Sequence, residues 1–161
     1  MIYVMSDIHG CYEEFRELLE KINFSEEDTL YILGDMLDRG PQPVKLILDL
    51  MCRSNVFPIL GNHDYMALVL LKKLDQDITP EKVDAILTKE VYQSYLHWLN
   101  DGGNVTARQY RKLPDDIKEY FLDYLQDCPL YEVVTVKEKT FVLTHADIHG
   151  HSEHLALSDH D

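Results

Sequence analysis

Short apolar runs and longer amphipathic segments alternate along the first half of the chain. Three apolar runs have the length and composition of β-strands: residues 2–5, 29–33 and 56–60. The segments that follow them are predicted helices, with apolar side chains at helical spacing in the first: residues 12–22, 44–51 and 65–74. Strands that alternate with helices predict an α/β layered fold.

The middle of the chain, about residues 80 to 126, differs in composition. It is helical in pattern and rich in aromatic side chains, with Pro80 and Pro114 near the expected helix starts and a break at Gly102-Gly103. We interpret it as a helical insertion of about residues 75–127, in which an apolar stripe serves packing: Tyr92, Tyr95, Leu96, Trp98 and Leu99. Two further strands are predicted at 131–136 and 140–143, joined by a charged turn. Residues 1–161 then form one domain with an atypical tail at 147–161.

The composition narrows the choice of partners and compartment. The net charge of −14 disfavours a nucleic-acid partner, because such binding depends on Lys and Arg displacing counterions. No apolar run is long enough to span a membrane, and the N-terminus has no signal-peptide pattern. The three cysteines are scattered, which favours reduced thiols in a cytoplasmic protein: Cys11, Cys52 and Cys128.

Four of the predicted strands are followed at once by side chains that bind metals. Asp7 and His9 follow the first strand, Asp35 the second, Asn62 the third and His145 the last. Ligands in open α/β sheets bind beyond the carboxyl ends of the strands, so four buried strands would bring these groups together. Asp7 and His9 are two residues apart, so in an extended segment both side chains would lie on one side.

The donor set indicates which metal to expect. Carboxylate, imidazole and amide donors suit Mn²⁺, iron or Zn²⁺ better than Ca²⁺, and no cysteine stands beside them as in structural zinc sites. Each motif alone has a simpler explanation: Asp7 could cap the next helix, and Gly34-Asp35 and Gly61-Asn62 are good turn sequences. Four strand ends in order favour a metal site.

These motifs resemble those of the calcineurin-like metallophosphoesterases. The matching segments are DIHG at 7–10, GDMLDRG at 34–40, GNHD at 61–64 and His145-Ala146. Within that family the DRG sequence is similar to the serine/threonine phosphoprotein phosphatase branch, which includes bacterial and phage protein phosphatases and symmetrical diadenosine tetraphosphate hydrolases. The resemblance implies a layered β-sandwich flanked by helices.

The resemblance also implies roles for individual residues. Asp7 and His9 would hold a first metal, Asp35 would bridge two metals, and Asn62 and His145 would hold the second, with Mn²⁺ expected and iron or Zn²⁺ as alternatives. A hydroxide activated by the two metals would attack the phosphate in line.

Three further groups would act on the substrate beside the metals. Arg39 would bind the phosphate, together with Asn62. His63 would protonate the leaving oxygen, and Asp38 would orient His63. No covalent enzyme intermediate is needed.

The end of the chain departs from the family pattern. Asp147 stands where relatives usually have Gly, the remaining residues are few, and no Arg follows Arg111. Three explanations compete: a truncated chain, replacement of a missing ligand by His149 or His151, or a tail that binds adventitious metal. We favour truncation, which predicts an incomplete sheet and a possible homodimer.

Three functions are compatible with this pattern. The leading prediction is a protein serine/threonine phosphatase, which would act on a phosphorylated protein or on a small phosphoester. The alternative is a symmetrical dinucleoside polyphosphate hydrolase with a nucleotide substrate. A third possibility is a truncated, catalytically impaired form that binds metal or a partner. Neither a nucleic acid nor a membrane is an expected partner.

Overall fold

The computed structural model describes residues 1–76, 86 and 88–146 of the 161. The start of the predicted helical insertion, including Pro80, falls partly outside these residues. The predicted atypical tail, with the candidate ligands His149 and His151, lies wholly outside them.

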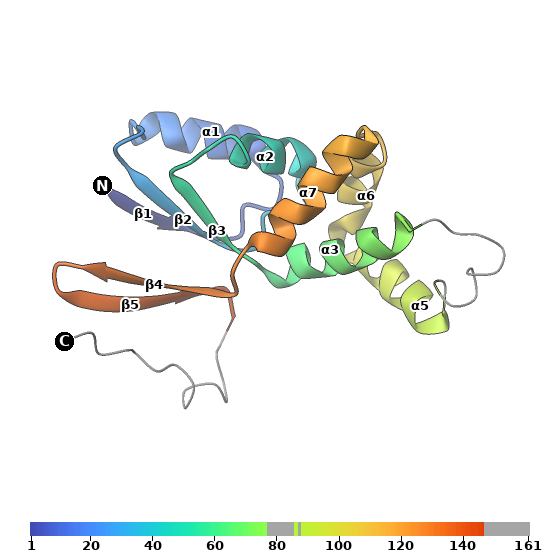
Figure 1. Cartoon of the computed structure of the whole chain (residues 1–161). Coiled ribbons are helices and arrows are strands. Elements are labelled where there is room, and N and C mark those ends of the chain that lie inside the picture. The colour runs from blue at the N-terminus through green and yellow to red at the C-terminus, as the bar shows by residue number, and fades with distance from the viewer. Residues whose placement is uncertain (77–85, 87, 147–161) are drawn as a thin grey trace, which may run out of the picture.

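Three parallel strands form the central sheet in the order β1 (Ile2–Met5), β2 (Thr29–Leu33) and β3 (Val56–Ile59). Parallel neighbours need crossover connections, which here are α1 (Tyr12–Lys21) and α2 (Pro43–Leu50). Both helices cover the same face of the sheet (Figure 1). The predicted strands and crossover helices are confirmed to within one residue at each end.

Alternation along the central strand explains why the helices pack on this face. Leu30 and Ile32 of β2 are fully buried, and they join one hydrophobic core with Phe15 of α1 and Leu46 and Ile47 of α2. Side chains along a strand alternate between the two faces of its sheet, so the residues between them point to the other side. One part of the core therefore lies between the sheet and the two crossover helices, and the same cluster continues through Leu71, Tyr110 and Phe121 of the later helices.

Helix α3 (Asn62–Leu74) begins three residues before the predicted start at residue 65. Gly61 is the N-cap, with an extended backbone, and the Asp64 carboxylate accepts the Gly61 N–H at 3.0 Å. A carboxylate at this position satisfies an N–H that the start of a helix would leave unpaired. Asn62 and His63 consequently lie on the first helical turn rather than in a loop.

Helices also form the middle of the chain, as predicted; its described residues supply four elements, α5 (Lys89–Trp98), η1 (Leu99–Gly103), α6 (Asn104–Tyr110) and α7 (Asp115–Asp127). The break at Gly102 is confirmed, with φ of 103°. Helix α6 packs on α2, and α7 packs on α3. Within the part of the chain that the structure describes, no helix is long and apolar enough to cross a membrane.

The last two strands, β4 (Tyr131–Val136) and β5 (Lys139–Thr144), pair with each other as an antiparallel hairpin. Their existence is confirmed, but the prediction that the fourth strand is buried beside the others is wrong. The hairpin is a separate sheet, and Val133 and Phe141 are exposed on it. It is tied to the end of β3 by the Leu60 N–H, which donates to the Pro129 carbonyl at 2.8 Å.

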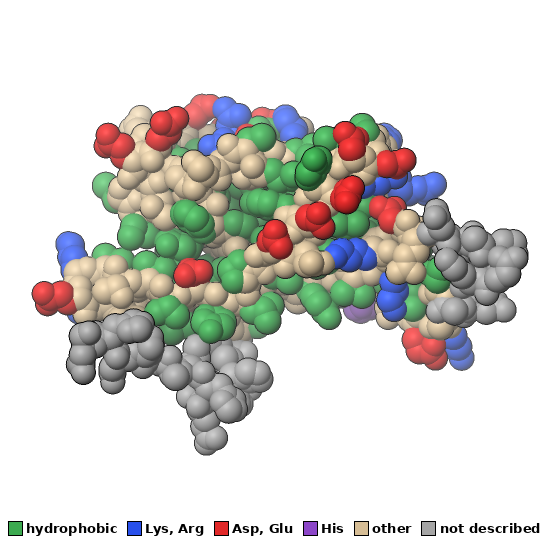
Figure 2. Space-filling view, viewed as in Figure 1, with side chains coloured by type: hydrophobic (Ala, Val, Ile, Leu, Met, Phe, Trp, Pro, Cys, Tyr) green, Lys and Arg blue, Asp and Glu red, His purple; other side chains and the backbone are tan. Residues whose placement is uncertain are grey.

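The face of the parallel sheet turned away from α1 and α2 is partly uncovered in the described structure. Ile2, Val4 and Phe57 are each more than two-fifths exposed. Figure 2 shows hydrophobic side chains across the region between the helical layer and the hairpin. The α/β architecture with a parallel sheet flanked by helices is confirmed, and the predicted sandwich stays a prediction, since β4 and β5 form only a separate two-stranded sheet among the described residues.

Candidate metal centre and phosphate site

The loops after β1 and β2 run side by side beyond the strands. The N–H groups of Asp7, His9 and Gly10 donate to the carbonyls of Gly34, Asp35 and Met36 at 3.1, 2.9 and 2.8 Å. Gly34 has a φ of 78°, and a Cβ there would lie 2.6 Å from the Gly61 Cα, so the β3 end also approaches closely. The first three motifs therefore meet at one edge of the sheet, as predicted.

The backbone that carries the reactive groups is left-handed rather than extended. The φ angles of Asp7, His9 and Asp35 are 54°, 46° and 52°, and those of Asp38 and Arg39 are 69° and 62°. The expectation that Asp7 and His9 share one side of an extended segment is therefore wrong. Each such residue costs about 1 kcal/mol or more, and strain of this kind clusters at functional sites.

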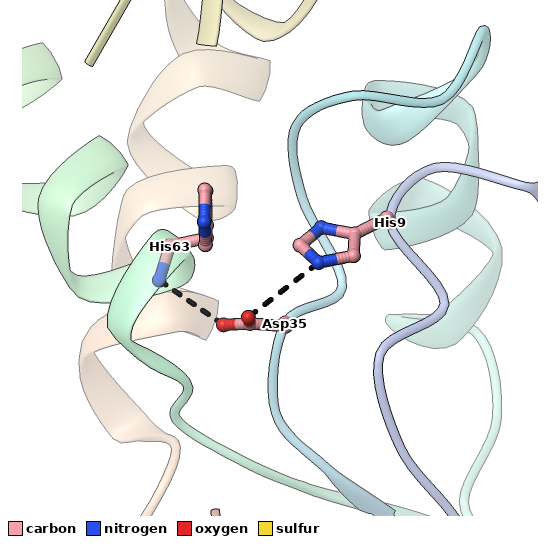
Figure 3. A group of neighbouring side chains, drawn as sticks. All are labelled: His9, Asp35 and His63. Carbon is pink, nitrogen blue, oxygen red and sulfur yellow. Dashed lines mark hydrogen bonds and ion pairs between the residues drawn. The ribbon is translucent and has the colours of Figure 1, made fainter. Parts of the chain in front are cut away.

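Two imidazoles face opposite oxygens of one buried carboxylate. The Nε2 of His9 lies 3.5 Å from Asp35 Oδ2, and the Nε2 of His145 lies 3.4 Å from Asp35 Oδ1. The backbone N–H of His63 also donates to Asp35 Oδ1 at 3.1 Å, so the carboxylate is held in place (Figure 3). Asp35 thus stands between two histidines that come from opposite ends of the chain.

The outer nitrogen of each imidazole is occupied by the backbone. His9 Nδ1 donates to the Leu37 carbonyl at 2.8 Å, and His145 Nδ1 donates to the Leu33 carbonyl at 2.7 Å. A carbonyl only accepts, so the proton sits on Nδ1 and the Nε2 lone pair of each ring points inward. Metal-binding histidines are fixed in this way by an acceptor on the other nitrogen.

The contact between His145 and Asn62 shows that the site fits a cation. His145 Nε2 lies 2.8 Å from Asn62 Oδ1, and with the ring proton on Nδ1 both atoms are acceptors. One metal ion could accept both lone pairs, and without an ion a rotated Asn62 amide would donate its N–H to the ring instead. The site therefore offers the imidazole and amide donors that a metal ion binds.

The remaining predicted ligand and the neighbouring histidine lie at the same edge. Asp7 is exposed, and its backbone is paired with Gly34. His9, Asp35 and His63 offer ligand atoms that all lie within 4.8 Å of one another. The structure therefore brings His63 as close to the centre as a ligand, although the sequence predicts a different role for it.

Arg39 lies across His9 and His63. Its Nη1 is 3.0 Å from His9 Nε2, its Nη2 is 2.9 Å from His63 Nε2, and half of the side chain is exposed. A planar guanidinium can bind a phosphate in bidentate fashion, and a phosphate that replaces the two histidine contacts could accept from both Nη atoms. Arg39 thus combines the predicted position with the exposure that a phosphate ligand needs.

His63 and Asp38 form a buried pair. His63 Nδ1 lies 2.8 Å from Asp38 Oδ2, with both side chains almost inaccessible to solvent. The Trp98 Nε1–H donates to the same oxygen at 2.7 Å, and the Thr106 hydroxyl donates to Asp38 Oδ1 at 2.6 Å. A buried charge is tolerated only when it is paired and hydrogen-bonded in this way.

Sequence reasoning missed Trp98 and Thr106. Trp98 stood out as the one tryptophan in an aromatic stripe, which we interpreted as packing. The packing is confirmed, because Trp98 is fully buried, but its indole N–H also serves the site. Thr106 gave no signal in the sequence.

Asp64 has a structural role that its place in the GNHD motif did not reveal. It is fully buried, and its carboxylate accepts the N–H groups of Met36, Leu37 and Gly61, each at 3.0 Å. Burial raises the pKa of Asp64 to about 6, while these N–H groups act in the opposite direction. Asp64 fastens the loop after β2 to the start of α3.

Comparisons with known proteins agree with this geometry. The family model of the calcineurin-like phosphoesterases matches residues 1–159. A symmetrical bis(5'-nucleosyl)-tetraphosphatase of Wigglesworthia glossinidia brevipalpis is 36% identical over 99 residues, which are 60% of this chain and 36% of that protein. A protein of the same name from Proteus mirabilis is 28% identical over 138 residues, which are 84% of this chain and 48% of the relative.

A crystal structure of a candidate diadenosine tetraphosphatase shares the fold, with a TM-score of 0.51 and 24% identity over 81% of this chain and 43% of the other. The chain spans less than half the length of these relatives. The family match nevertheless covers nearly every residue, and the motifs that carry it converge at one sheet edge. The chain belongs to the calcineurin-like phosphoesterase family, whose members are metal-dependent hydrolases.

Proposed function

We propose that this protein hydrolyses dinucleoside polyphosphates by symmetrical cleavage, using two divalent metal ions. Arg39 and His63, on which the prediction of a phosphoprotein phosphatase rested, belong to motifs that both classes of enzyme share. They do not distinguish a phosphoprotein from a nucleotide substrate. The named relatives support the nucleotide substrate, since both are symmetrical bis(5'-nucleosyl)-tetraphosphatases.

The observation that carries the proposal is the position of Asp35 between His9 Nε2 and His145 Nε2. In this assignment Asp35 would bridge two ions. Asp7 and His9 would complete one set of ligands, and Asn62 and His145 the other. The ions, when bound, would lower the pKa of a water molecule and stabilise the oxygens of an in-line displacement. Mn²⁺ is the proposed metal, with iron or Zn²⁺ as alternatives that the same donors accept.

The residues around this centre would manage the substrate and its proton. Arg39 would bind the phosphate through its exposed guanidinium, with Asn62 as a second contact. In the form that carries a proton on both ring nitrogens, His63 would donate the Nε2 proton to the leaving phosphate oxygen. Asp38 would keep the other ring nitrogen protonated and would fix the plane of the ring, since both groups are buried and 2.8 Å apart.

The test compares substrates and products with the purified chain loaded with Mn²⁺. Diadenosine tetraphosphate should yield ADP as the nucleotide product, and a phosphoserine peptide should be hydrolysed more slowly. Asp35→Asn should lose both bound metal and turnover, because the bridge loses its charge. Asp123→Asn, an exposed site on α7, is the matched control.

Two outcomes would contradict the proposal. ATP and AMP as products would exclude symmetrical cleavage. A protein that holds two metal ions and turns over neither substrate would support the catalytically impaired form instead.

A further inference from the structure

Asp101 brings a negative charge to the place where Arg39 and His63 meet. Its Oδ1 lies 3.3 Å from Arg39 Nη2, and its Oδ2 lies 3.6 Å from His63 Nε2. Its side chain is 43% exposed, so it borders the open edge of the site and not its buried floor. Neither the sequence motifs nor the metal and phosphate assignments above use this residue.

The backbone around Asp101 fixes it in this place. Asp101 belongs to η1, and the carbonyl of the next residue, Gly102, accepts the Arg39 N–H at 3.1 Å. Gly102 has a φ of 103°, and a Cβ there would lie 2.6 Å from the Arg39 Cγ. A side chain at Gly102 would therefore push the turn away from Arg39, and the glycine lets Asp101 approach.

We propose that Asp101 is a specificity-determining residue that disfavours doubly charged phosphate groups and tolerates singly charged ones. The inference rests on the assignment of Arg39 as the phosphate ligand in the proposed function. Nη2 carries two N–H groups, which point to His63 Nε2 and Asp101 Oδ1, so a phosphate oxygen bound to Nη2 would replace His63 Nε2 and would lie about 2.9 Å from Nη2. Since Asp101 Oδ1 is 3.3 Å from the same nitrogen, the two oxygens would be at most about 6 Å apart.

The charge of the substrate then decides how strongly Asp101 opposes it. A phosphomonoester carries close to two negative charges at neutral pH, whereas each bridging phosphate of a polyphosphate chain carries one. Coulomb energy is proportional to charge, so a repulsion that costs a dianion about tenfold in affinity costs a monoanion about threefold. Asp101 would thus favour the bridging phosphates of a dinucleoside polyphosphate over a phosphorylated side chain.

Asp101→Asn tests this charge effect, because asparagine keeps the size and the oxygen that accepts from Arg39. The probes are inorganic phosphate at pH 8, which is mainly a dianion, and dimethyl phosphate, a monoanion. Their affinities for the Mn²⁺-loaded chain are measured by calorimetry, together with turnover of diadenosine tetraphosphate and p-nitrophenyl phosphate. Asp123→Asn carries the same change of charge on α7 and controls for net charge.

The inference predicts that Asp101→Asn binds inorganic phosphate about tenfold more tightly and dimethyl phosphate about threefold more tightly. The preference in kcat/KM should move toward p-nitrophenyl phosphate by a similar ratio, while Asp123→Asn leaves both ratios as in the unsubstituted chain. Equal gains for the two probes would overturn it. Weaker binding of both would also overturn it and would mean that Asp101 merely holds Arg39 in place.

The binding and turnover results separate this inference from the proposed function. Selective binding without hydrolysis of either substrate would contradict the proposed function and support the charge selection. Hydrolysis of the dinucleotide with an unchanged preference in Asp101→Asn would do the reverse. An unsubstituted chain that binds neither probe would overturn both, because Arg39 would not be a phosphate ligand.

Discussion

His63 is the residue for which position and proposed role must be separated by experiment. Its Nδ1 is committed to Asp38, and its Nε2 faces Arg39 at the open edge of the site. It also lies close enough to His9 and Asp35 to be a metal ligand. Proximity does not distinguish a proton donor from a ligand, whereas metal content does.

We expect His63→Asn to lower kcat by about a hundredfold or more, because a positioned general acid contributes about 10²–10⁴ to the rate. The bound metal, measured by elemental analysis, should stay at the level of the unsubstituted protein. His97→Asn, an exposed histidine on α5, is the control and should change neither quantity. Loss of metal from His63→Asn would make His63 a ligand and reverse the assignment.

Arg39 combines an exposed, reactive side chain with a strained backbone. Its φ of 62° is a conformation that costs a residue with a Cβ about 1–2 kcal/mol. Arg39→Gly should therefore be more stable to urea than Arg39→Ala by about 1 kcal/mol, although both lose the guanidinium. The free energy of unfolding from denaturant titration measures this difference.

Arg108 provides the opposite case for comparison. It is exposed within α6, where Gly costs about 1 kcal/mol relative to Ala. The order of the two variants should be reversed at Arg108. If the Ala variant were the more stable one at both positions, the left-handed conformation of Arg39 would carry no cost in stability.

At the scale of elements, the helical segment contributes directly to the site. Trp98 ends α5 and Thr106 lies in α6, and both donate to the buried carboxylate of Asp38. A hydrogen bond to a charged group contributes about 1.5–3 kcal/mol. The two helices therefore hold the Asp38–His63 pair in addition to packing on the core.

Trp98→Phe removes one of these hydrogen bonds while keeping most of the buried aromatic surface. We expect kcat to fall by about tenfold, with KM and metal content nearly unchanged, and the free energy of unfolding to fall by about 1–3 kcal/mol. Tyr92→Phe, at an exposed aromatic residue of the same helix, should change neither kcat nor the free energy of unfolding. An unchanged kcat in Trp98→Phe would mean that the indole N–H does not support the reaction.

The local hydrophobic pattern predicted most helices and strands. The features that it missed are determined by tertiary contacts. The runs around Leu30 and Phe15 have clear strand and helix periods, so β2 and α1 were predicted from the sequence. The early start of α3 depends on the Asp64 carboxylate, which also bonds backbone groups 27 and 28 residues away. Such contacts leave no trace in hydrophobic spacing.

The site likewise contains residues that the sequence pattern predicted and residues that it missed. The order of motifs at strand ends predicted that His9, Asp35 and Asn62 would meet, because parallel strands share one edge. His145 reaches that edge from a separate hairpin, so the reason given for its position was wrong although the position is confirmed. Trp98, Thr106 and Asp101 approach from the helical segment, and nothing in local sequence indicates that approach.

At the scale of the whole molecule, the uncovered face of the parallel sheet is an exposed apolar surface. Ile2, Val4 and Phe57 lie on this face. The hairpin of β4 and β5, which is itself partly exposed, lies on the same side of the sheet (Figure 1). Burying one such side chain contributes about 1.5–3 kcal/mol. A second copy of the chain would cover this face, as the predicted homodimer requires.

We expect the chain to associate as its concentration rises, and more strongly at high salt, which screens the charge of −14. The double variant Val4→Lys, Phe57→Lys should stay monomeric in sedimentation and light-scattering measurements. Leu18→Lys changes an exposed apolar residue on α1 and should associate like the unsubstituted chain. A chain that is monomeric at every concentration would contradict the predicted homodimer.

The contacts from Trp98 and Thr106 to Asp38 also bear on protein engineering. The helical segment is a natural choice for exchange between relatives when a chimera with a new substrate preference is wanted. Here such an exchange would replace Asp101, which contacts Arg39, together with two groups that hold Asp38 beside the proposed proton donor. On the proposed assignments, selectivity and proton delivery would be exchanged together, so a successful graft would have to keep Trp98 and Thr106.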